Sequence, residues 1–146
     1  MRLYLLPLVL SLLVGIGPGA FAQPAITAGE FIQRGIERAS RNDIRGMNEN
    51  FEQALRLEPK AYQVYVQRGY ARSMVKDYKG AVEDQTMALR LKPDSAEAYT
   101  NRGTSRYRLG DRKGARADWQ KALEIFRQKG ADEQAEQVAA VLRQYK

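Results

Sequence analysis

Few side chains in this sequence are suited to covalent or metal chemistry. The chain of 146 residues contains neither cysteine nor histidine, which excludes thiol nucleophiles, imidazole bases, disulfides and the commonest soft metal sites. Carboxylate catalysis needs two acids held across a pocket, but the neighbours Glu83 and Asp84 point to different sides of a helix. The sequence has no phosphate-binding loop and no metal-ligand spacing. It therefore predicts a non-catalytic protein without a cofactor or metal, and a carboxylate hydrolase is only a remote alternative.

Cations are the most abundant groups with which the chain could bind a partner. There are 24 Lys and Arg against 17 Asp and Glu, a formal charge of +7. Such an excess fits an acidic partner, an anionic surface or solubility alone. The cations gather in three short breaks of a helical pattern, each with one Asp. They are Arg41, Arg45, Lys76, Lys79, Arg108, Arg112, Lys113 and Arg116.

If the three breaks lie along one edge of the molecule, that edge is positive. The charge is greatest in the third break, at Arg108, Arg112, Lys113 and Arg116. Two interpretations stay open: a solvated edge, and binding to an anionic surface or acidic polymer. Binding that weakens steeply with salt would favour the second. Nucleic acid is not expected, because no basic and aromatic surface motif is present and the N-terminus indicates export.

The N-terminus, residues 1–22, has the pattern of a secretory signal peptide. Arg2 provides the positive start, residues 3–16 are mostly apolar, and Ala20 and Ala22 are the small residues of a cleavage site. The apolar run is short for a membrane anchor, the competing interpretation. The sequence therefore predicts a protein exported to a periplasm, a thylakoid-lumen-like compartment or the extracellular space.

One pattern occurs three times after this segment, at intervals of 34 residues. It consists of an aromatic residue, an Arg-Gly pair and an Ala-Leu pair. The copies are Phe31, Arg34-Gly35 and Ala54-Leu55; Tyr65, Arg68-Gly69 and Ala88-Leu89; and Tyr99, Arg102-Gly103 and Ala122-Leu123. A fixed period of this size indicates an array of units that bury their apolar faces by stacking on one another.

Helical periodicity divides each copy into two helices, A and B. The expected A helices span 29–40, 61–75 and 96–109, and the B helices span 45–57, 79–91 and 113–127. Asp43, Asp77 and Asp111 precede the B helices as N-caps. Asp94 with Glu97 is expected to form a capping box, and Asp132 to cap a final helix. The Gly residues at 46, 80 and 114 suggest that helices approach closely there.

These copies resemble the tetratricopeptide repeat (TPR), whose pattern is W-x2-L-G-x2-Y, then A-x3-F and a later Pro. The resemblance implies an all-α, right-handed TPR superhelix (α-solenoid). Its parts would be a linker at 23–27, repeats at 28–61, 62–95 and 96–129, and a C-terminal capping helix at 130–146. Departures include Gln85 in place of the aromatic and Arg127 in place of the Pro.

The resemblance implies that the A helices line a concave groove that binds a protein or peptide partner. Amides recur there at one position, with hydroxyl and aromatic groups beside them. The predicted partner-binding residues are Gln33, Gln67, Tyr70, Asn101, Thr104 and Tyr107. A solvated face without a tight ligand is the alternative. A homo-oligomer is possible in principle, but no feature of the sequence predicts one.

Some relatives of this family clamp a chaperone's terminal carboxylate with basic and amide groove residues. The matching positions here are Ile32, Ile36, Gln67, Glu97 and Asn101. None is cationic, and Glu97 would repel a carboxylate, so this specificity is not expected.

The Arg residues of the repeated pattern have a structural interpretation in this family. The resemblance places Arg34, Arg68 and Arg102 against helix B, where Asn50, Asp84 and Asp118 could accept their hydrogen bonds. The alternative is a basic stripe for a phosphorylated or acidic ligand.

Overall fold

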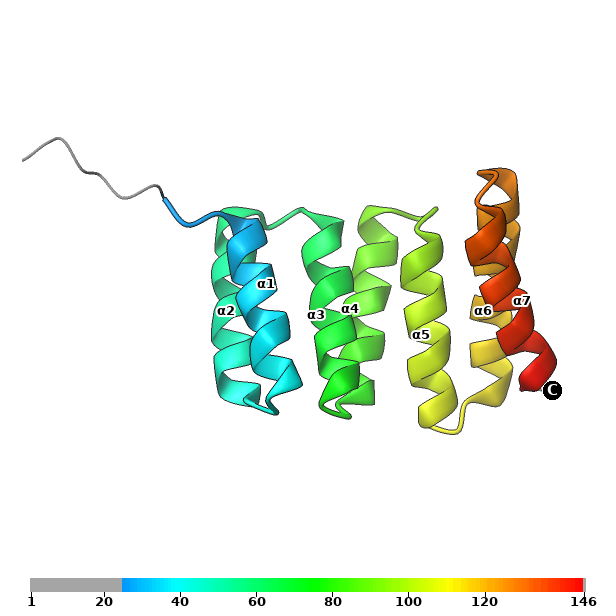
Figure 1. The fold of residues 1–146 in the computed structure, drawn as a ribbon, viewed down its shortest axis with the longest axis horizontal. Helices are drawn as coiled ribbons and strands as arrows, with labels where there is room; N and C mark the ends of the chain where they lie inside the picture. Colours follow the sequence, from blue (N-terminus) through cyan, green and yellow to red (C-terminus); the bar gives the residue numbers. More distant parts are fainter. Residues whose placement is uncertain (1–24, 146) are drawn as a thin grey trace, which may run out of the picture.

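The computed structural model describes residues 25–145, which form seven α-helices and no strand within that range. The signal peptide predicted at 1–22 lies outside the described residues. In Figure 1 the helices form a row of antiparallel pairs. Their bounds are α1 Ala28–Ser40, α2 Ile44–Leu57, α3 Tyr62–Met74, α4 Tyr78–Leu91, α5 Ala96–Arg108, α6 Arg112–Gln128 and α7 Asp132–Gln144. The predicted all-α solenoid is confirmed, and each predicted bound of helices A and B lies within one residue of the observed one.

Each B helix is capped by the predicted aspartate. Asp43, Asp77 and Asp111 accept hydrogen bonds from the backbone N–H groups of Gly46, Gly80 and Gly114, at 2.8–3.0 Å. A Cβ at any of these glycines would collide with the capping carboxylate. The glycines therefore make room first for the cap, whereas the sequence suggested only a close helix approach.

Two other predicted caps are wrong. Helix α5 is capped by Ser95, whose side chain accepts from Ala98 N, and Asp94 instead accepts from Lys129 Nζ at 2.8 Å. Helix α7 has Ala131 at its N-cap without a side-chain hydrogen bond, so Asp132 is the first helical residue. A capping box does form at α1, between Thr27 and Glu30.

Within each pair, a glycine of helix A faces a large residue of helix B. A Cβ on Gly35 would lie 2.7 Å from the Phe51 ring, and one on Gly103 would lie 2.7 Å from Trp119 Nε1. Gly69 faces Gln85 in the same way, and Gln85 is fully buried with its Nε2 donating to Val66 O at 3.0 Å. Small residues at these sites therefore set the spacing of the pairs, as the repeated pattern indicated.

Arg–Asp pairs join helices A and B in the second and third repeats. Asp84 accepts two bonds from Arg68, at 2.9 and 2.6 Å, and lies 3.0 Å from Arg72 Nη1. Asp118 is bonded in the same way by Arg102 and Arg106. The structural interpretation of these arginines is thus confirmed in two repeats.

The first repeat does not have this pair, so that part of the prediction is wrong. Asn50 donates to Gly46 O at 2.7 Å, within its own helix. Arg34 is exposed and lies over the Phe31 ring at 5.9 Å. An amide at position 50 has no charge to draw the guanidinium inward, so the pairing found in the later repeats does not form.

Candidate binding site

Helices α1, α3 and α5 lie beside one another and face the viewer in Figure 1, with α2, α4 and α6 behind them. Helix α1 contacts α3, and α3 contacts α5. Helix α7 packs on α6, as α5 packs on α4. The front face formed by α1, α3, α5 and α7, called the groove face below, is therefore built mainly from the helices that the family resemblance assigned to the groove.

Three of the predicted partner-binding residues line one small cleft. Tyr70 on α3 and Asn101 and Thr104 on α5 surround a volume of about 120 Å³ together with Ser73. Ser73 and Ser105 share a hydrogen bond of 2.8 Å across the two helices. The cleft, called the middle cleft below, thus presents hydroxyls, an amide and a phenol that is about half exposed.

The other three predicted residues lie elsewhere. Gln67 Nε2 donates to Glu97 Oε1 across α3 and α5 at 3.4 Å, and exposed Gln33 donates to Glu37 on its own helix at 3.4 Å. Tyr107 packs with ring centroids 5.9 Å from Trp119 and 4.5 Å from Tyr145. Its ring therefore belongs to the aromatic cluster under α7 and is partly buried.

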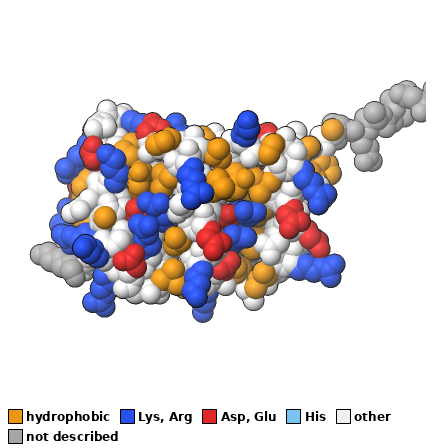
Figure 2. All heavy atoms as spheres, turned by 180° about the vertical axis from the view of Figure 1, so that it is seen from behind, with side chains coloured by type: hydrophobic (Ala, Val, Ile, Leu, Met, Phe, Trp, Pro, Cys, Tyr) orange, Lys and Arg blue, Asp and Glu red, His pale blue; other side chains and the backbone are white. Residues whose placement is uncertain are grey.

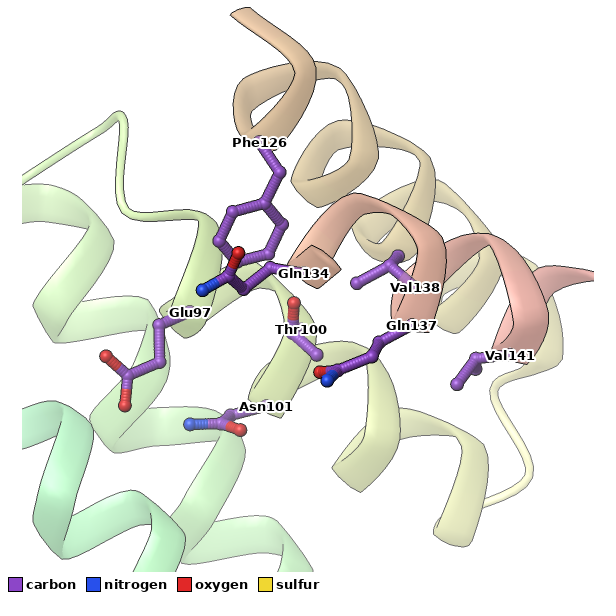
Figure 3. A pocket seen from close by; sticks show the side chains of 8 residues that line it. All are labelled: Glu97, Thr100, Asn101, Phe126, Gln134, Gln137, Val138 and Val141. Atoms are coloured by element: carbon purple, nitrogen blue, oxygen red, sulfur yellow. The ribbon is translucent and has the colours of Figure 1, made fainter. Parts of the chain in front are cut away.

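A second, larger cleft of about 250 Å³ lies between α5 and α7, and we call it the end cleft (Figure 3). Phe126, Val138 and Val141 supply its apolar walls. The polar residues around it are Glu97, Thr100, Asn101, Gln134 and Gln137. Apart from Asn101, these residues were not among the predicted partner-binding residues. Four of the eight lining residues belong to α7, which carries no repeat pattern that could have predicted them, and Phe126 lies near the end of the last B helix, whose residues were not assigned to the groove.

The groove face contains no cation at the positions compared with the chaperone clamp. Ile32 and Ile36 pack against the first apolar cluster, which contains Phe51 and Val64. Glu97 is exposed and lies between Gln67 and the end cleft. None of these side chains provides a positive charge for a carboxylate, so the absence of this specificity stays a prediction.

The cations of the breaks between helices A and B lie on one edge, because the α1–α2, α3–α4 and α5–α6 turns are all at the bottom of Figure 1. Among the described residues, Arg108, Arg112, Lys113 and Arg116 are exposed and make no ion pair. Arg45, at the first turn, is paired with Glu49 at 2.8 Å. The edge is therefore most strongly positive at the third turn.

The face opposite the groove face is shown in Figure 2. Hydrophobic side chains form a band across it, interrupted by cations and acids (Figure 2). A shallow hollow of about 330 Å³ on α4 is lined by Val82, Glu83, Thr86, Met87 and Arg90. All of its lining residues belong to one helix, so a ligand there would be contacted from one side, whereas a ligand in a cleft would be contacted by two helices.

Two further absences apply to the described residues. None of the helices between residues 25 and 145 is long and apolar enough to cross a membrane. That part of the chain also contains no group of acidic side chains placed to hold a metal ion.

The family described as "Tetratricopeptide repeat" matches residues 67–143. This range is more than half of the chain, and the helix pairs have the arrangement that the sequence pattern predicted. The chain therefore belongs to the tetratricopeptide repeat family. The match begins within α3, and the first helix pair is defined by the 34-residue period and its place in the row of helices.

Several solved structures have the same fold. The TPR domain of Arabidopsis OM64 is 22% identical, with a TM-score of 0.67 over 82% of this chain and 97% of that chain. The TPR2B domain of yeast Sti1, in complex with an Hsp70 peptide, is 16% identical, with a TM-score of 0.72 over 81% and 94%. PcrH, in complex with the chaperone-binding region of PopD, is 14% identical, with a TM-score of 0.70 over 80% and 89%. No curated protein matches the sequence.

Proposed function

We propose that this protein is a non-catalytic scaffold that binds an extended or helical segment of a partner protein along its groove face. The observation that carries the proposal is the middle cleft, where Tyr70, Asn101 and Thr104 from two repeats meet. Amide and hydroxyl groups can pair with the backbone of a bound segment, and a half-exposed Tyr offers apolar contact together with a polar end. A groove of this kind favours a peptide over a compact small molecule, because the volume of each cleft is smaller than the roughly 300–1,000 Å³ of a typical small-molecule site.

Structures with the same fold support this proposal by analogy. Two of them are complexes, one of Sti1 TPR2B with an Hsp70 peptide and one of PcrH with a region of PopD. Their identity to this chain is 16% or lower, so they do not indicate which residues bind or what the partner is. The chemistry of the groove must therefore be tested on this chain.

The test of the groove replaces Gln67 and Tyr70 together with Ala. Partners are first identified by crosslinking the chain of residues 23–146 in its native compartment, and capture is then measured for each variant. We expect the double variant to lose most of the capture, because it removes an amide and a half-buried ring from the centre of the groove. The matched control replaces Gln53 on α2 and Tyr78 on α4, neither of which lines a cleft of the groove face. If the groove variant captured the partner as well as the unmodified protein does, the proposal would be contradicted.

Export is part of the proposed function. The pattern at residues 1–22 supports cleavage after Ala22, so that the mature protein begins at Gln23. Mass spectrometry of the protein recovered from cells tests this directly. An intact N-terminus on the recovered protein would oppose it.

The basic edge supports a second candidate function, binding to an anionic surface or acidic polymer. Arg112, Lys113 and Arg116 are exposed at one turn and have no acidic partner among the described residues. Replacing all three with Gln should weaken binding to vesicles that contain phosphatidylglycerol, and added salt should weaken it further. The control makes the same change of charge away from this edge, at Arg56, Lys60 and Arg90. Equal binding by both variants, or binding insensitive to salt, would rule this function out.

A further inference from the structure

The end cleft has a shape and a charge that restrict what the groove can bind. It exists because α7 packs on α6 but does not pack against α5 as closely as α3 does. The space between α5 and α7 is left to side chains, and Figure 3 shows Gln137 pointing across it toward Thr100 and Asn101. Its volume of about 250 Å³ is below that of most small-molecule pockets and is suited to one or two side chains of a peptide.

Its interior is apolar. Phe126 comes from α6, and Val138 and Val141 come from one face of α7. Val138 is 4% exposed, while Phe126 and Val141 are half-buried, so apolar surface remains open to the cleft. Filling this space with an apolar side chain removes that surface from water, which contributes about 25 cal/mol per Å².

The lining of the cleft carries charge of one sign. Among the described residues, Glu97 is the only ionisable one that lines the cleft, and its carboxylate points away from α7 (Figure 3), on the side of Gln67 of α3. Its one hydrogen bond among the described residues is the 3.4 Å contact from Gln67. The amides of Asn101, Gln134 and Gln137 carry no charge that would oppose a cation. A positively charged group beside an apolar anchor therefore meets a complementary surface.

We infer that the end cleft binds an apolar side chain of a partner protein segment that carries Lys or Arg next to that side chain. The inference rests on the proposed function and specifies its ligand. The apolar side chain enters between Phe126 and Val141, and the neighbouring cation pairs with Glu97. The preferred segment is therefore positively charged, unlike the ligands that bind through a terminal carboxylate.

The experiment titrates the isotope-labelled protein with short blocked peptides and follows its backbone amides by NMR. One peptide has a central Leu flanked by Lys. A second has the Leu flanked by Glu, and a third has Ala flanked by Lys. We expect the first to shift the amides of Thr100, Gln137 and Val141. Replacing Leu with Ala should weaken binding by about tenfold or more, and replacing Lys with Glu by several-fold.

Two variants test the two parts of the inference separately. Glu97→Gln should make the Lys-flanked and Glu-flanked peptides bind equally, whereas Glu52→Gln on exposed α2 surface should leave the preference intact. Gln137→Phe places a ring in the cleft and should abolish the shifts, whereas Gln144→Phe, on the same helix, should not. Both lining positions are exposed, so the variants should keep their helical circular dichroism and thermal transition.

The readout by residue separates failure of this inference from failure of the proposed function. Shifts confined to Tyr70, Ser73 and Thr104 would overturn the inference and leave groove binding intact. Equal affinity for Leu and Ala, or for Lys and Glu, would also overturn it. If sedimentation showed a dimer, and if dilution of that dimer shifted the amides of the end cleft, a second copy would be the occupant of the cleft. These two results together would contradict the inference. If no peptide shifts any groove residue, the inference fails, and the Gln67 and Tyr70 variant then decides the proposed function separately.

Discussion

At the scale of single residues, two buried aspartates differ from every other acid in the described chain. The side chains of Asp84 and Asp118 are 4% exposed, and each accepts hydrogen bonds or close ion-pair contacts from two arginines. Bidentate pairing of this kind satisfies a buried carboxylate that would otherwise be very unfavourable. The arginines are therefore committed to holding helix A on helix B and are not available to a ligand.

Asp118→Asn should lower the free energy of unfolding by about 3 kcal/mol, because Arg102 and Arg106 lose a buried charged acceptor. Urea unfolding followed by circular dichroism measures the change. Glu49→Gln is the control, since Arg45 and Glu49 are largely exposed and their pair should contribute nothing measurable. Equal stability of the two variants would contradict the structural role of the pair.

A loop acid makes part of the stability dependent on pH. Hydrogen bonds from Lys129 and then Lys92 lower the pKa of Asp94 from 3.8 to about 2. Because the folded pKa lies below the unfolded one, this contribution is complete above about pH 4 and is lost as the pH falls toward 2. Asp94→Asn should therefore make unfolding less sensitive to acid in that range. The control is Asp132→Asn, at an exposed aspartate that makes no cap hydrogen bond, and it should leave the acid sensitivity of unfolding unchanged.

At the scale of elements, each turn from helix A to helix B combines an Asp cap with a Gly three residues later. The cap satisfies an N–H group at the start of the helix, and the missing Cβ leaves space for the carboxylate. The two residues form one device, so their effects should not add. This explains why a residue of low helix propensity occurs in the first turn of three helices.

A double-mutant cycle at Asp77 and Gly80 tests this device. Gly80→Ala alone should destabilise the protein by about 1 kcal/mol, because the new Cβ displaces the capping carboxylate. In the Asp77→Ala background the cap is already gone, and the same change should be neutral or should stabilise by up to about 1 kcal/mol. Thermal unfolding of the four proteins measures the coupling, and additive effects would show that the two residues act independently.

At the scale of the whole molecule, α7 closes the end of the array. It covers Ala115, Trp119 and Ala122 of α6 with Val138 and its neighbours, and Tyr145 packs 5.8 Å from the Trp119 ring. Without it, the last repeat would expose the surface that earlier repeats bury against the next one. The same helix forms one wall of the end cleft, so it contributes both stability and a binding surface.

Deleting residues 131–146 should remove about 3 kcal/mol of stability, or roughly 10–15 °C in Tm for a domain of this size. The emission of Trp119, the sole tryptophan, should shift to the red as water reaches it. Calorimetry and fluorescence measure the two effects. Tyr70→Ala, at a half-exposed ring of the groove face, should change neither. An unaltered Tm after the deletion would mean that the array does not need α7.

The sequence by itself determined the helix pairs, their order, and the Arg–Asp contacts within the second and third pairs. It could do so because each depends on neighbouring or periodically spaced residues, such as Asp77 as the N-cap of α4 and the small Gly103 that faces Trp119. The periodic pattern also identified Tyr70, Asn101 and Thr104 as residues of one face, and the structure brings them into one cleft. The misplaced caps at Asp94 and Asp132 were local choices between adjacent residues, which propensity alone could not resolve.

Only the tertiary structure decided where α7 lies and what it forms. Its packing on α6 creates the end cleft from residues about 30–40 positions apart, including Glu97 and Val138, which share no repeat register. It also draws Tyr107 into the cluster with Tyr145 and separates it from the middle cleft. Periodicity reports which residues share a helix face, but the gap between two helices depends on how all their side chains pack together.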